Sequence, residues 1–271
     1  LLVHKLTGAK LVYHEHDASI GRTSLPGQVA GLARRRVLDV ADVVVVPSEG
    51  RRALLGSRGD RSIVVWNCPL ISEISEKAVG EEGRVTMAYA GSLSPDRLPA
   101  TFIHALAKLP ATVDLKVFGY ETIGFPNYYA ELQNVARELG VAGSLSRRIA
   151  PSRRQLLSEL ETCDIGIATL NLRSTDANVQ SMLGASNKPF DYLAAGLPIL
   201  VSNAPDWINT FVEPGYATSC DPNDVDSIVA GVQPLLDPAV RHRMASAGRA
   251  RLLSDWNYER QFAPVFDRLV G

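Results

Sequence analysis

The stretch SNKPFDYLAAGLPILVSN, from Ser186 to Asn203, predicts a short helix followed directly by a buried strand. Gly196 suits the C-terminus of a helix, and Pro198 prevents the helix from continuing. The wholly apolar run of residues 199–201 is typical of a strand that is covered on both faces. The stretch is therefore interpreted as loop, helix, tight turn and buried parallel strand.

Two charged residues stand at the beginning of this helix. Lys188 and Asp191 are three positions apart, so both side chains can share one helix face. They form either a surface ion pair or part of a binding site. Because they lie beside a glycine-containing loop at a junction of strand and helix, we favour the binding site.

The same alternation of apolar runs and amphipathic stretches extends over the whole chain. It indicates βαβ units, in which parallel sheets carry helices on both faces. The fold class expected is α/β, with two Rossmann-like doubly wound parallel-sheet domains. Strands are predicted at residues 10–14, 42–47, 62–66, 85–89, 115–118, 146–149, 165–168 and 199–201, and helices at 25–39, 48–55, 98–108, 127–139, 152–161, 224–236, 239–253 and 259–269.

A polar segment, ISEISEKAVGEEG at residues 71–83, interrupts this pattern and contains two glycines. It separates a first domain (1–75) from a second (84–250), with 76–83 as the linker. The first domain is too short for a complete doubly wound unit, and the chain opens with LLVHKLTGAK, without Met. We therefore expect an N-terminally truncated sequence.

Composition narrows the class of protein. With 271 residues and 46% hydrophobic content the chain can bury a sizeable core, and a net charge of −1 gives no reason to expect nucleic-acid binding. The basic groups Arg34–Arg36 and Arg147–Arg148 are local patches. Cys68, Cys163 and Cys220 are odd in number and far apart, which favours reduced thiols in a cytoplasmic protein. No run reaches the length of a membrane span, and no signal-peptide pattern is present.

Three stretches follow predicted strands or precede a helix at one edge of the second sheet: YAGSLSPDR (89–97), FGYET (118–122) and GASNKPFD (184–191). Ligands of doubly wound sheets bind at this edge, beyond the carboxyl ends of the strands. Gly91 and Gly119 permit close backbone approach, the third stretch offers backbone N–H groups, and Arg97 and Lys188 supply positive charge. Together they predict a site for a phosphate-bearing ligand, although none is a Walker loop or a dinucleotide fingerprint.

The motifs AGSLSPDR, NKPFDYLAAGLPILVS and DWNYERQF resemble the C-terminal half of retaining glycosyltransferases of the GT-B fold, in particular glycosyltransferase family 4. ADVVVVPSEGRRALL followed by IVVWNCP is similar to the end of that family's N-terminal domain. The resemblance implies transfer of a sugar, with retention, from a nucleotide-diphosphate donor to an acceptor hydroxyl in polysaccharide, glycolipid or glycoconjugate synthesis. It implies a metal-independent, hexosyltransferase-like enzyme without a cofactor, acting on a carbohydrate or lipid-linked acceptor in the cytoplasm or at the inner membrane face.

The resemblance also assigns residues. Asp191 takes the position of the family's second glutamate and is expected to hold ribose hydroxyls, whereas Leu183 replaces the first. Arg97 matches the family's lysine, while Ser92 replaces its arginine, so that Lys188 or Arg148 would have to substitute. Residues 251–271 resemble the closing helix that returns to the first domain, with Trp256, Tyr258 and Phe262 as anchors. The donor-binding residues expected are Gly91, Ser92, Arg97, Gly119, Tyr120, Ile149, Gly184, Ser186, Asn187, Lys188 and Asp191.

The motif HEHD raises a separate question. On a strand, His14 and His16 point to one side and Glu15 to the other. A metal site needs three or four ligands, and no local partner has suitable spacing. The resemblance places His16 and Asp17 near the reacting sugar, where they are the predicted catalytic residues; the alternative is a histidine held by backbone groups.

Other polar residues have two interpretations. Glu121 either contacts a sugar or caps a turn, and we favour the cap. The acidic residues of Asp224–Asp226 suit a helix start better than a metal site. The helix with Arg34–Arg36 has either a solvated face or one that meets an anionic membrane. Two further functions stay open: a sugar-nucleotide epimerase of the same architecture, and a non-catalytic nucleotide-sugar binding subunit.

Overall fold

The structure is a computed structural model that describes residues 6–16, 25–75, 83–122, 124–149 and 152–271. The chain divides into two compact units. Unit 1 combines Leu1–Leu70, Ser174–Ser186 and Asp255–Gly271, and unit 2 combines Ile71–Arg173 and Asn187–Ser254. Each unit has its own parallel sheet, which agrees with the α/β class expected from the alternation of strand and helix patterns.

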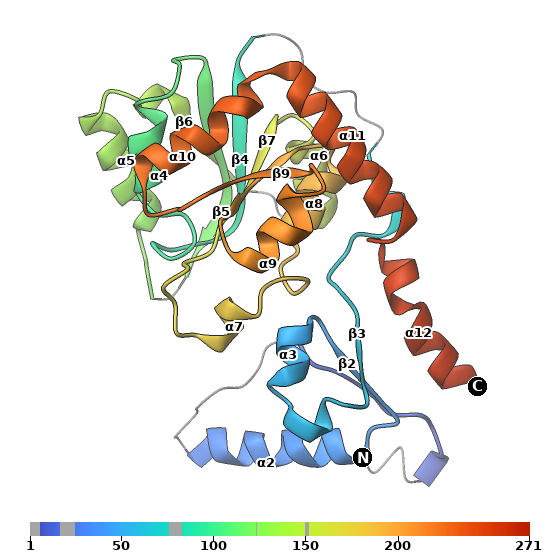
Figure 1. Cartoon of the computed structure of the whole chain (residues 1–271). Coiled ribbons are helices and arrows are strands. Elements are labelled where there is room, and N and C mark those ends of the chain that lie inside the picture. Colours follow the sequence, from blue (N-terminus) through green and yellow to red (C-terminus); the bar gives the residue numbers. More distant parts are fainter. Residues whose placement is uncertain (1–5, 17–24, 76–82, 123, 150–151) are drawn as a thin grey trace. The chain divides into compact units, whose positions relative to one another are not determined.

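Unit 2 is built on a six-stranded parallel sheet with the order β6-β5-β4-β7-β8-β9 (Figure 1). The chain starts in the middle of the sheet, moves to one edge, returns, and moves to the other edge. The order reverses between β4 and β7, which is the switch point where doubly wound sheets bind ligands. The strands are β4 (Val85–Leu93), β5 (Val113–Glu121), β6 (Leu145–Arg148), β7 (Ile165–Ala168), β8 (Ile199–Ser202) and β9 (Ala217–Cys220).

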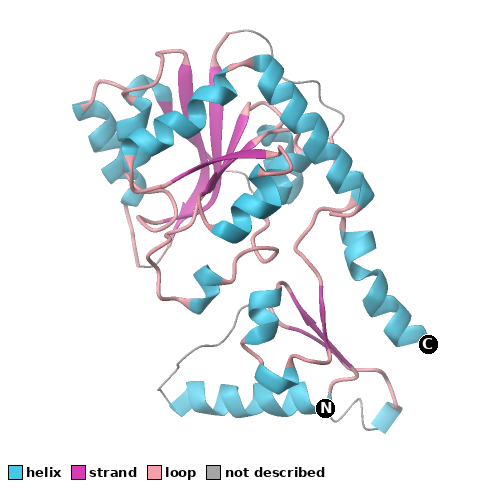
Figure 2. Cartoon of the chain, viewed as in Figure 1, coloured by secondary structure: helices cyan, strands magenta, loops and turns pink. Residues whose placement is uncertain are grey.

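Helices cover both faces of this sheet (Figure 2). One layer contains α4 (Thr101–Leu106), α5 (Tyr128–Glu138) and α10 (Val225–Val232), and the other contains α6 (Arg153–Leu160), α8 (Lys188–Ala194) and α11 (Pro238–Ser254). Strands β7 and β8 are buried at every position, because both of their faces pack against helices. Short elements complete the unit: α9 (Pro205–Trp207), a π-helical turn (Ile208–Val212) and 3-10 turns at Ile71–Glu73, Ala142–Ser144 and Gln233–Leu236.

One contact fixes the distance between α8 and the sheet. Tyr192 of α8 is fully buried, and its ring lies directly on Gly166 of β7. A Cβ atom on Gly166 would come within 2.2 Å of the ring atom Cγ. The hydroxyl of Tyr192 accepts a 2.7 Å hydrogen bond from the backbone N–H of Ala90 in β4. The helix is therefore attached to both strands of the switch point.

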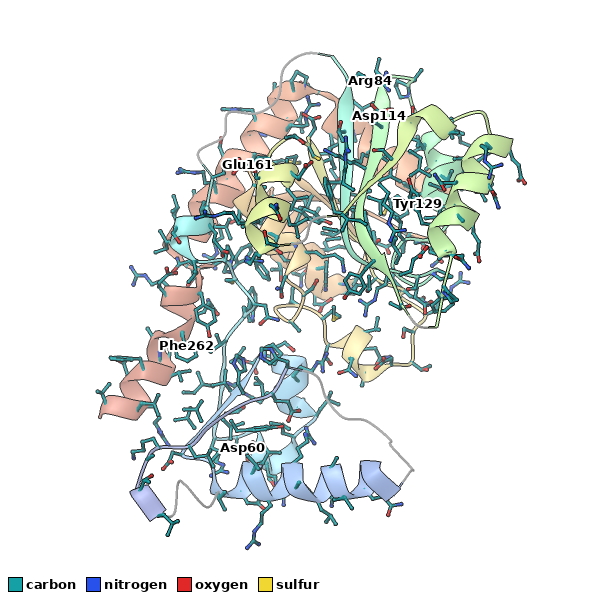
Figure 3. The ribbon with its side chains drawn as sticks, turned by 180° about the vertical axis from the view of Figure 1, so that it is seen from behind. Asp60, Arg84, Asp114, Tyr129, Glu161 and Phe262 are labelled. Atoms are coloured by element: carbon teal, nitrogen blue, oxygen red, sulfur yellow. The ribbon has the colours of Figure 1, made fainter. Side chains whose placement is uncertain are left out.

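The amino ends of β4 and β5 are joined by a different interaction. Arg84 and Asp114 lie next to each other (Figure 3), and Arg84 Nε donates to Asp114 Oδ2 over 2.6 Å. This pair is largely exposed to solvent and contributes little to stability.

Unit 1 contains a three-stranded parallel sheet in the order β1-β2-β3, formed by Val12–His14, Val43–Val46 and Ser62–Val64. Its helices are α2 (Leu25–Val40), α3 (Glu49–Ala53), α7 (Ala177–Gln180) and α12 (Tyr258–Val270), with a 3-10 turn at Gly56–Arg58. Leu38 of α2 packs against one face of β2, and Val265 of α12 packs against the other. The run of four valines in β2 is thus buried from both sides.

The sequence predicted most of these elements but missed or shortened some. The edge strand β9 was missed because its sequence, ATSC, has no apolar run. The short helices α7 and α9 were also missed. Strands β4 and β5 extend to Leu93 and Glu121, beyond the predicted ends, because the glycines that suggested a turn are paired within the sheet. Residues 76–82 of the predicted linker lie outside the described residues.

We expect Gly166→Ala to lower the free energy of unfolding by roughly 1–3 kcal/mol, because the added methyl group overpacks the Tyr192 ring. Urea unfolding of the full chain, followed by circular dichroism, measures the change. Gly143→Ala is the matched control, since a Cβ atom there meets nothing within 4 Å. Equal unfolding midpoints for the two variants would contradict the packing argument.

Candidate functional site

Two glycines bring the carboxyl ends of β4 and β5 close together. Gly91 and Gly119 are partners in the strand register, and a Cβ atom on Gly119 would lie 2.7 Å from the carbonyl oxygen of Gly91. Gly91 has a φ of 132°, a conformation that other residues rarely adopt. Both positions therefore need glycine, and the backbone there is open to close approach.

The side chain of Lys188 lies on Gly91. A Cβ atom at residue 91 would come within 2.8 Å of Lys188 Cε and 3.1 Å of its Nζ. The ammonium nitrogen is 5.6 Å from the centre of the Tyr89 ring, a cation–π arrangement. Among the described residues, none forms an ion pair or hydrogen bond with the Lys188 side chain, and its nitrogen is not one of the buried atoms that lack a partner. The ammonium group therefore keeps some contact with solvent and has no ion-pair partner among the described residues.

The pKa of Lys188 responds to this environment. Burial and, to a smaller extent, the positive charge of Arg97 lower the pKa of Lys188 to about 8, while Asp191 acts in the opposite direction. The charged form is therefore disfavoured until an anion arrives. A half-buried cation of this kind is suited to binding phosphate.

Arg97 supplies the second positive charge. Its side chain has no ion pair within the described ranges, and its backbone carbonyl accepts a 3.2 Å hydrogen bond from Thr169 Oγ1. The neighbouring Asp96 accepts from Asn171 Nδ2 over 2.7 Å. These two bonds connect the loop after β4 with the loop after β7, on either side of the switch point.

Asp191 does not pair with Lys188. Its Oδ1 instead accepts a 2.9 Å hydrogen bond from Arg153 Nη2, whose guanidinium also binds Glu73. The interpretation of Lys188 and Asp191 as a surface ion pair is therefore wrong: Asp191 is only 7% exposed, and the Lys188 side chain lies on β4. Burial raises the pKa of Asp191, and Arg153 opposes that shift.

Arg153 is the residue of this group that sequence reasoning missed. It is the first residue of α6, directly after Ser152, which caps the helix by accepting from Gln155 N. In the sequence Arg153 and Arg154 are adjacent, and nothing indicates which of them meets an acid 38 positions away. Only the packing of α6 beside α8 brings Arg153 to Asp191.

At the end of β5, Arg147 holds the backbone. Its Nε and Nη2 donate to the carbonyl oxygen of Gly119 over 3.1 and 3.0 Å, and its guanidinium lies 5.2 Å from the centre of the Tyr129 ring (Figure 3 labels Tyr129). Tyr120 is 67% exposed beside it. Glu121 accepts a 3.0 Å hydrogen bond from Tyr129 N at the start of α5, which confirms that it acts as a cap.

Three further predicted residues stand at the same edge of unit 2. Ser92 is the register partner of Tyr120, and its carbonyl oxygen accepts a hydrogen bond from Tyr89. Ile149 follows β6 and is 82% exposed. Asn187 is exposed at the start of α8, and its side chain makes no capping hydrogen bond. The structure therefore gathers nine of the predicted donor residues in unit 2: Gly91, Ser92, Arg97, Gly119, Tyr120, Ile149, Asn187, Lys188 and Asp191.

Gly184 and Ser186 belong to unit 1. A Cβ atom on Gly184 would lie 2.5 Å from the Trp66 side chain, and the Gly184 carbonyl accepts from Asn67 N over 2.8 Å. The N–H of Ser186 is already bonded to the carbonyl of Met182. Within their own unit both residues have packing roles, and the Ser186 N–H is not free for a ligand as the sequence suggested.

The histidines of HEHD alternate as predicted. The rings of His14 and His16 stack with centres 4.2 Å apart, while Glu15 pairs with Arg34 of α2. Burial lowers the pKa of His14, whose Nε2 has no hydrogen-bond partner. No cluster of three or more His, Cys, Asp or Glu within the described ranges is arranged to hold a metal. His16 is exposed, and Asp17 lies outside the described residues.

Asp224 and Asp226 take part in helix chemistry, as the sequence indicated. Asp224 caps α10 by accepting from Asp226 N over 2.9 Å, and Asp226 pairs with Lys108.

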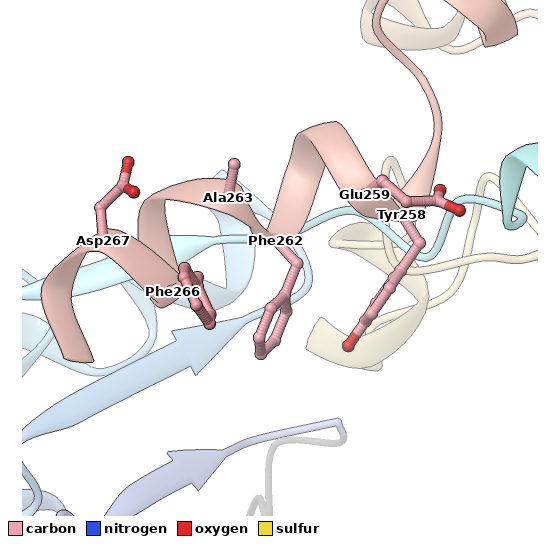
Figure 4. Close-up of a pocket in the computed structure, with 6 residues that line it drawn as sticks. All are labelled: Tyr258, Glu259, Phe262, Ala263, Phe266 and Asp267. Atoms are coloured by element: carbon pink, nitrogen blue, oxygen red, sulfur yellow. The ribbon is translucent and has the colours of Figure 1, made fainter. Parts of the chain in front are cut away.

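A groove of about 390 Å³ lies along α12 and is lined by Tyr258, Glu259, Phe262, Ala263, Phe266 and Asp267 (Figure 4). Its aromatic residues Tyr258 and Phe262 stack on each other and also pack against unit 1's sheet, and Trp256 is buried beside Trp66. The groove has acidic and apolar walls without a cation, so it is unsuited to phosphate. Among the described helices, none is both long and apolar enough to cross a membrane.

Several solved structures are similar to this chain, and two of the three described here are named as glycosyltransferases. Anabaena HepE, solved with UDP and glucose, is 17% identical, with a TM-score of 0.72 over 99% of this chain and 74% of HepE. A Rickettsia africae glycosyltransferase is 12% identical, with a TM-score of 0.70 over 98% of this chain and 71% of its own. WaaG, a glycosyltransferase involved in lipopolysaccharide biosynthesis, is 14% identical, with a TM-score of 0.62 over 97% of this chain and 77% of WaaG.

These likenesses establish the GT-B type of fold, with parallel sheets in both units. No curated protein matches the sequence itself. The sequence profile of the glycosyl transferase-like family matches residues 97–267, which is more than half of the chain and includes Arg97, Lys188 and Asp191. The chain therefore belongs to the glycosyl transferase-like family.

Proposed function

We propose that the chain transfers a sugar from a nucleotide-diphosphate donor to an acceptor hydroxyl. The observation that carries the proposal is the Lys188 ammonium, which keeps some contact with solvent, has no ion-pair partner among the described residues and lies on Gly91 at the switch point of unit 2. Family membership and the UDP complex of Anabaena HepE support it. Of the nucleotides, UDP is accordingly the first to test.

In this proposal Lys188 and Arg97 bind the donor diphosphate, and Gly91 lets the phosphates approach the backbone. Asp191 has one carboxylate oxygen bound to Arg153, and the other accepts a hydrogen bond from a ribose hydroxyl. Tyr120 and Ile149 are exposed at the ends of the two neighbouring strands, β5 and β6, where they would form an apolar surface for the base.

The transfer breaks the bond between the sugar C1 and the diphosphate oxygen and forms one between C1 and the acceptor oxygen. Negative charge develops on the departing diphosphate, and Lys188 and Arg97 stabilise it as fixed cations in place of a metal ion. Retention without a covalent intermediate requires the acceptor to approach from the side of the leaving group, so that the acceptor proton passes to the diphosphate. His16 would orient the hydroxyl by hydrogen bonding.

As the acceptor we propose a glycan or a lipid-linked sugar. The enzyme would act in the cytoplasm and contact the inner membrane face. Helix α2 exposes Val29 and Leu32 together with Arg35 and Arg36, a combination suited to an anionic lipid surface. Arg34 does not contribute, because it is bound to Glu15.

A panel of nucleotide sugars tests the activity. With a UDP-sugar we expect release of UDP together with the free sugar, or its transfer when an acceptor is added, detected by mass spectrometry. Formation of an epimer at unchanged nucleotide would instead identify a sugar-nucleotide epimerase. Tight binding with neither product would identify a non-catalytic binding subunit.

Lys188→Met is expected to weaken UDP binding by about ten- to hundredfold, because it removes a charged hydrogen bond to phosphate. The same variant should be more stable than the parent, by roughly 2–4 °C in Tm for each kcal/mol gained, because a half-buried cation is replaced by an apolar chain of similar length. Calorimetric titration and thermal unfolding measure the two effects. Lys108→Met, at an exposed ion pair, is the control and should change neither by much. If Lys188→Met bound UDP as tightly as the parent, the assignment of the donor site would be wrong.

The affinity for UDP should also fall as the pH rises above about 8, because Lys188 loses its proton there while the phosphates are already ionised. Lys188→Met should lack this dependence. Stability changes in the opposite sense. The pKa of lysine is 10.5 in the unfolded chain and about 8 in the fold, so the unfolded state holds more protons between these values. Parent stability therefore rises over that window, and the Tm advantage of Lys188→Met should disappear by about pH 10.5. If the pH profiles of UDP affinity and of Tm were parallel in the parent and in Lys188→Met, the role assigned to Lys188 would be contradicted.

A further inference from the structure

One guanidinium in unit 2 binds two carboxylates from two other elements. Arg153 of α6 donates to Glu73 with Nε (2.7 Å) and Nη2 (3.1 Å), and the same Nη2 donates to Asp191 Oδ1 over 2.9 Å. Glu73 ends the 3-10 turn Ile71–Glu73, and Asp191 lies in α8. Neither carboxylate is a freely solvated surface group, since the Glu73 side chain is 22% exposed and the Asp191 side chain 10%.

The segment that carries Glu73 is held against α8. Ser75 N donates to the carbonyl of Ala194 over 2.8 Å, and Arg249 Nε donates to the carbonyl of Ser75 over 2.9 Å. Glu73 therefore has a fixed position relative to Asp191. Because a guanidinium is a planar, rigid fork, two bonds to Glu73 also fix the orientation of the nitrogen that binds Asp191.

Asp191 needs such a partner. It is almost wholly buried, and burial favours its protonated form. Arg153 is the cation within hydrogen-bond distance of Asp191, and it occupies Oδ1. Oδ2 has no hydrogen bond in the described part of the chain and is not among the buried atoms without a partner, so it is open to a ligand.

We propose that Arg153 is a positioning residue for nucleotide selectivity: it holds the Asp191 carboxylate so that Oδ2 accepts a hydrogen bond from a ribose hydroxyl. The inference rests on the proposed function, because it assumes that Asp191 meets the ribose of a nucleotide donor. Glu73 completes the arrangement by keeping the guanidinium at Asp191. Without it, a neighbouring diphosphate would compete for Arg153.

The test compares UDP with 2′-deoxy-UDP and 3′-deoxy-UDP by calorimetric titration of the full chain at pH 7. We expect the parent to bind UDP about tenfold or more tightly than at least one of the deoxy analogues. In Arg153→Met this preference should fall to within about threefold, while the affinity for that deoxy analogue changes little. Arg154→Met is the matched control: Arg154 is the next residue of α6, is exposed, and has no ion pair within the described ranges, so it should keep the preference.

The pH dependence separates positioning from a merely structural role. The charged groups that face Asp191 are Arg153, Glu73 and Lys188. Without Arg153 the burial of Asp191 and the negative charge of Glu73 both favour protonation. The preference for UDP should therefore be lost at a higher pH in Arg153→Met than in the parent, within a titration from pH 5 to 7.5. Arg153→Lys, which keeps the charge, should restore part of it.

A second pair of variants controls for misfolding of Arg153→Met. Asp191→Asn keeps the shape and removes the charge that Arg153 compensates, so adding Arg153→Met to it should change the preference no further. A parent that does not bind UDP refutes the proposed donor site, and the inference with it. A parent that binds UDP but shows no ribose preference refutes the role of Asp191. A folded Arg153→Met variant that keeps the parental preference and pH profile refutes the positioning role alone.

Discussion

The contact between Tyr192 and Gly166 is the constraint on which the candidate site depends. It sets how closely α8 lies on the sheet, and the bond from Ala90 to the Tyr192 hydroxyl fixes the helix along the direction of β4. Lys188 lies one helical turn before Tyr192, and Asp191 is its immediate neighbour in the chain. The positions of both charged groups therefore depend on the packing of an aromatic ring that is not itself part of the binding site. Glycine at 166 and at 91 makes room for the ring and the lysine respectively, and no larger residue would leave space for either.

The surroundings of the Asp191 carboxylate and of the Lys188 ammonium differ. Asp191 is buried and provided with a partner, whereas Lys188 is half buried and left without one. An unpaired cation in such a place reduces stability, since charges are stabilised mainly by water or by counter-ions. It persists where a ligand supplies the missing charge, and a diphosphate has the charge to do so. This contrast gives a stronger argument for phosphate binding than the presence of a lysine in the sequence.

The backbone around this pair is held by side chains that are engaged in hydrogen bonds within the chain. Arg147 binds the carbonyl of Gly119, Thr169 binds that of Arg97, and Asn171 binds Asp96. Each bond connects a loop at the carboxyl edge of the sheet to the next strand or loop. Such fixed loops reduce the reorganisation needed when charge develops on a leaving group.

Periodicity, Gly196 and Pro198 are local signals, and from them the sequence predicted the fold class and the sheet edge that carries the candidate site. It also identified Lys188, Asp191, Gly91 and Gly119, and the capping roles of Glu121 and Asp224. It missed β9, whose four residues carry no apolar run, and it left open a surface ion pair between Lys188 and Asp191, whereas Asp191 pairs with Arg153. Only the tertiary structure decided that Arg153 and Glu73 serve Asp191 and that Lys188 stays unpaired. The Arg153–Asp191 and Glu73–Arg153 contacts join residues 38 and 80 positions apart, and such pairs depend on how helices pack on a sheet rather than on spacing along the chain.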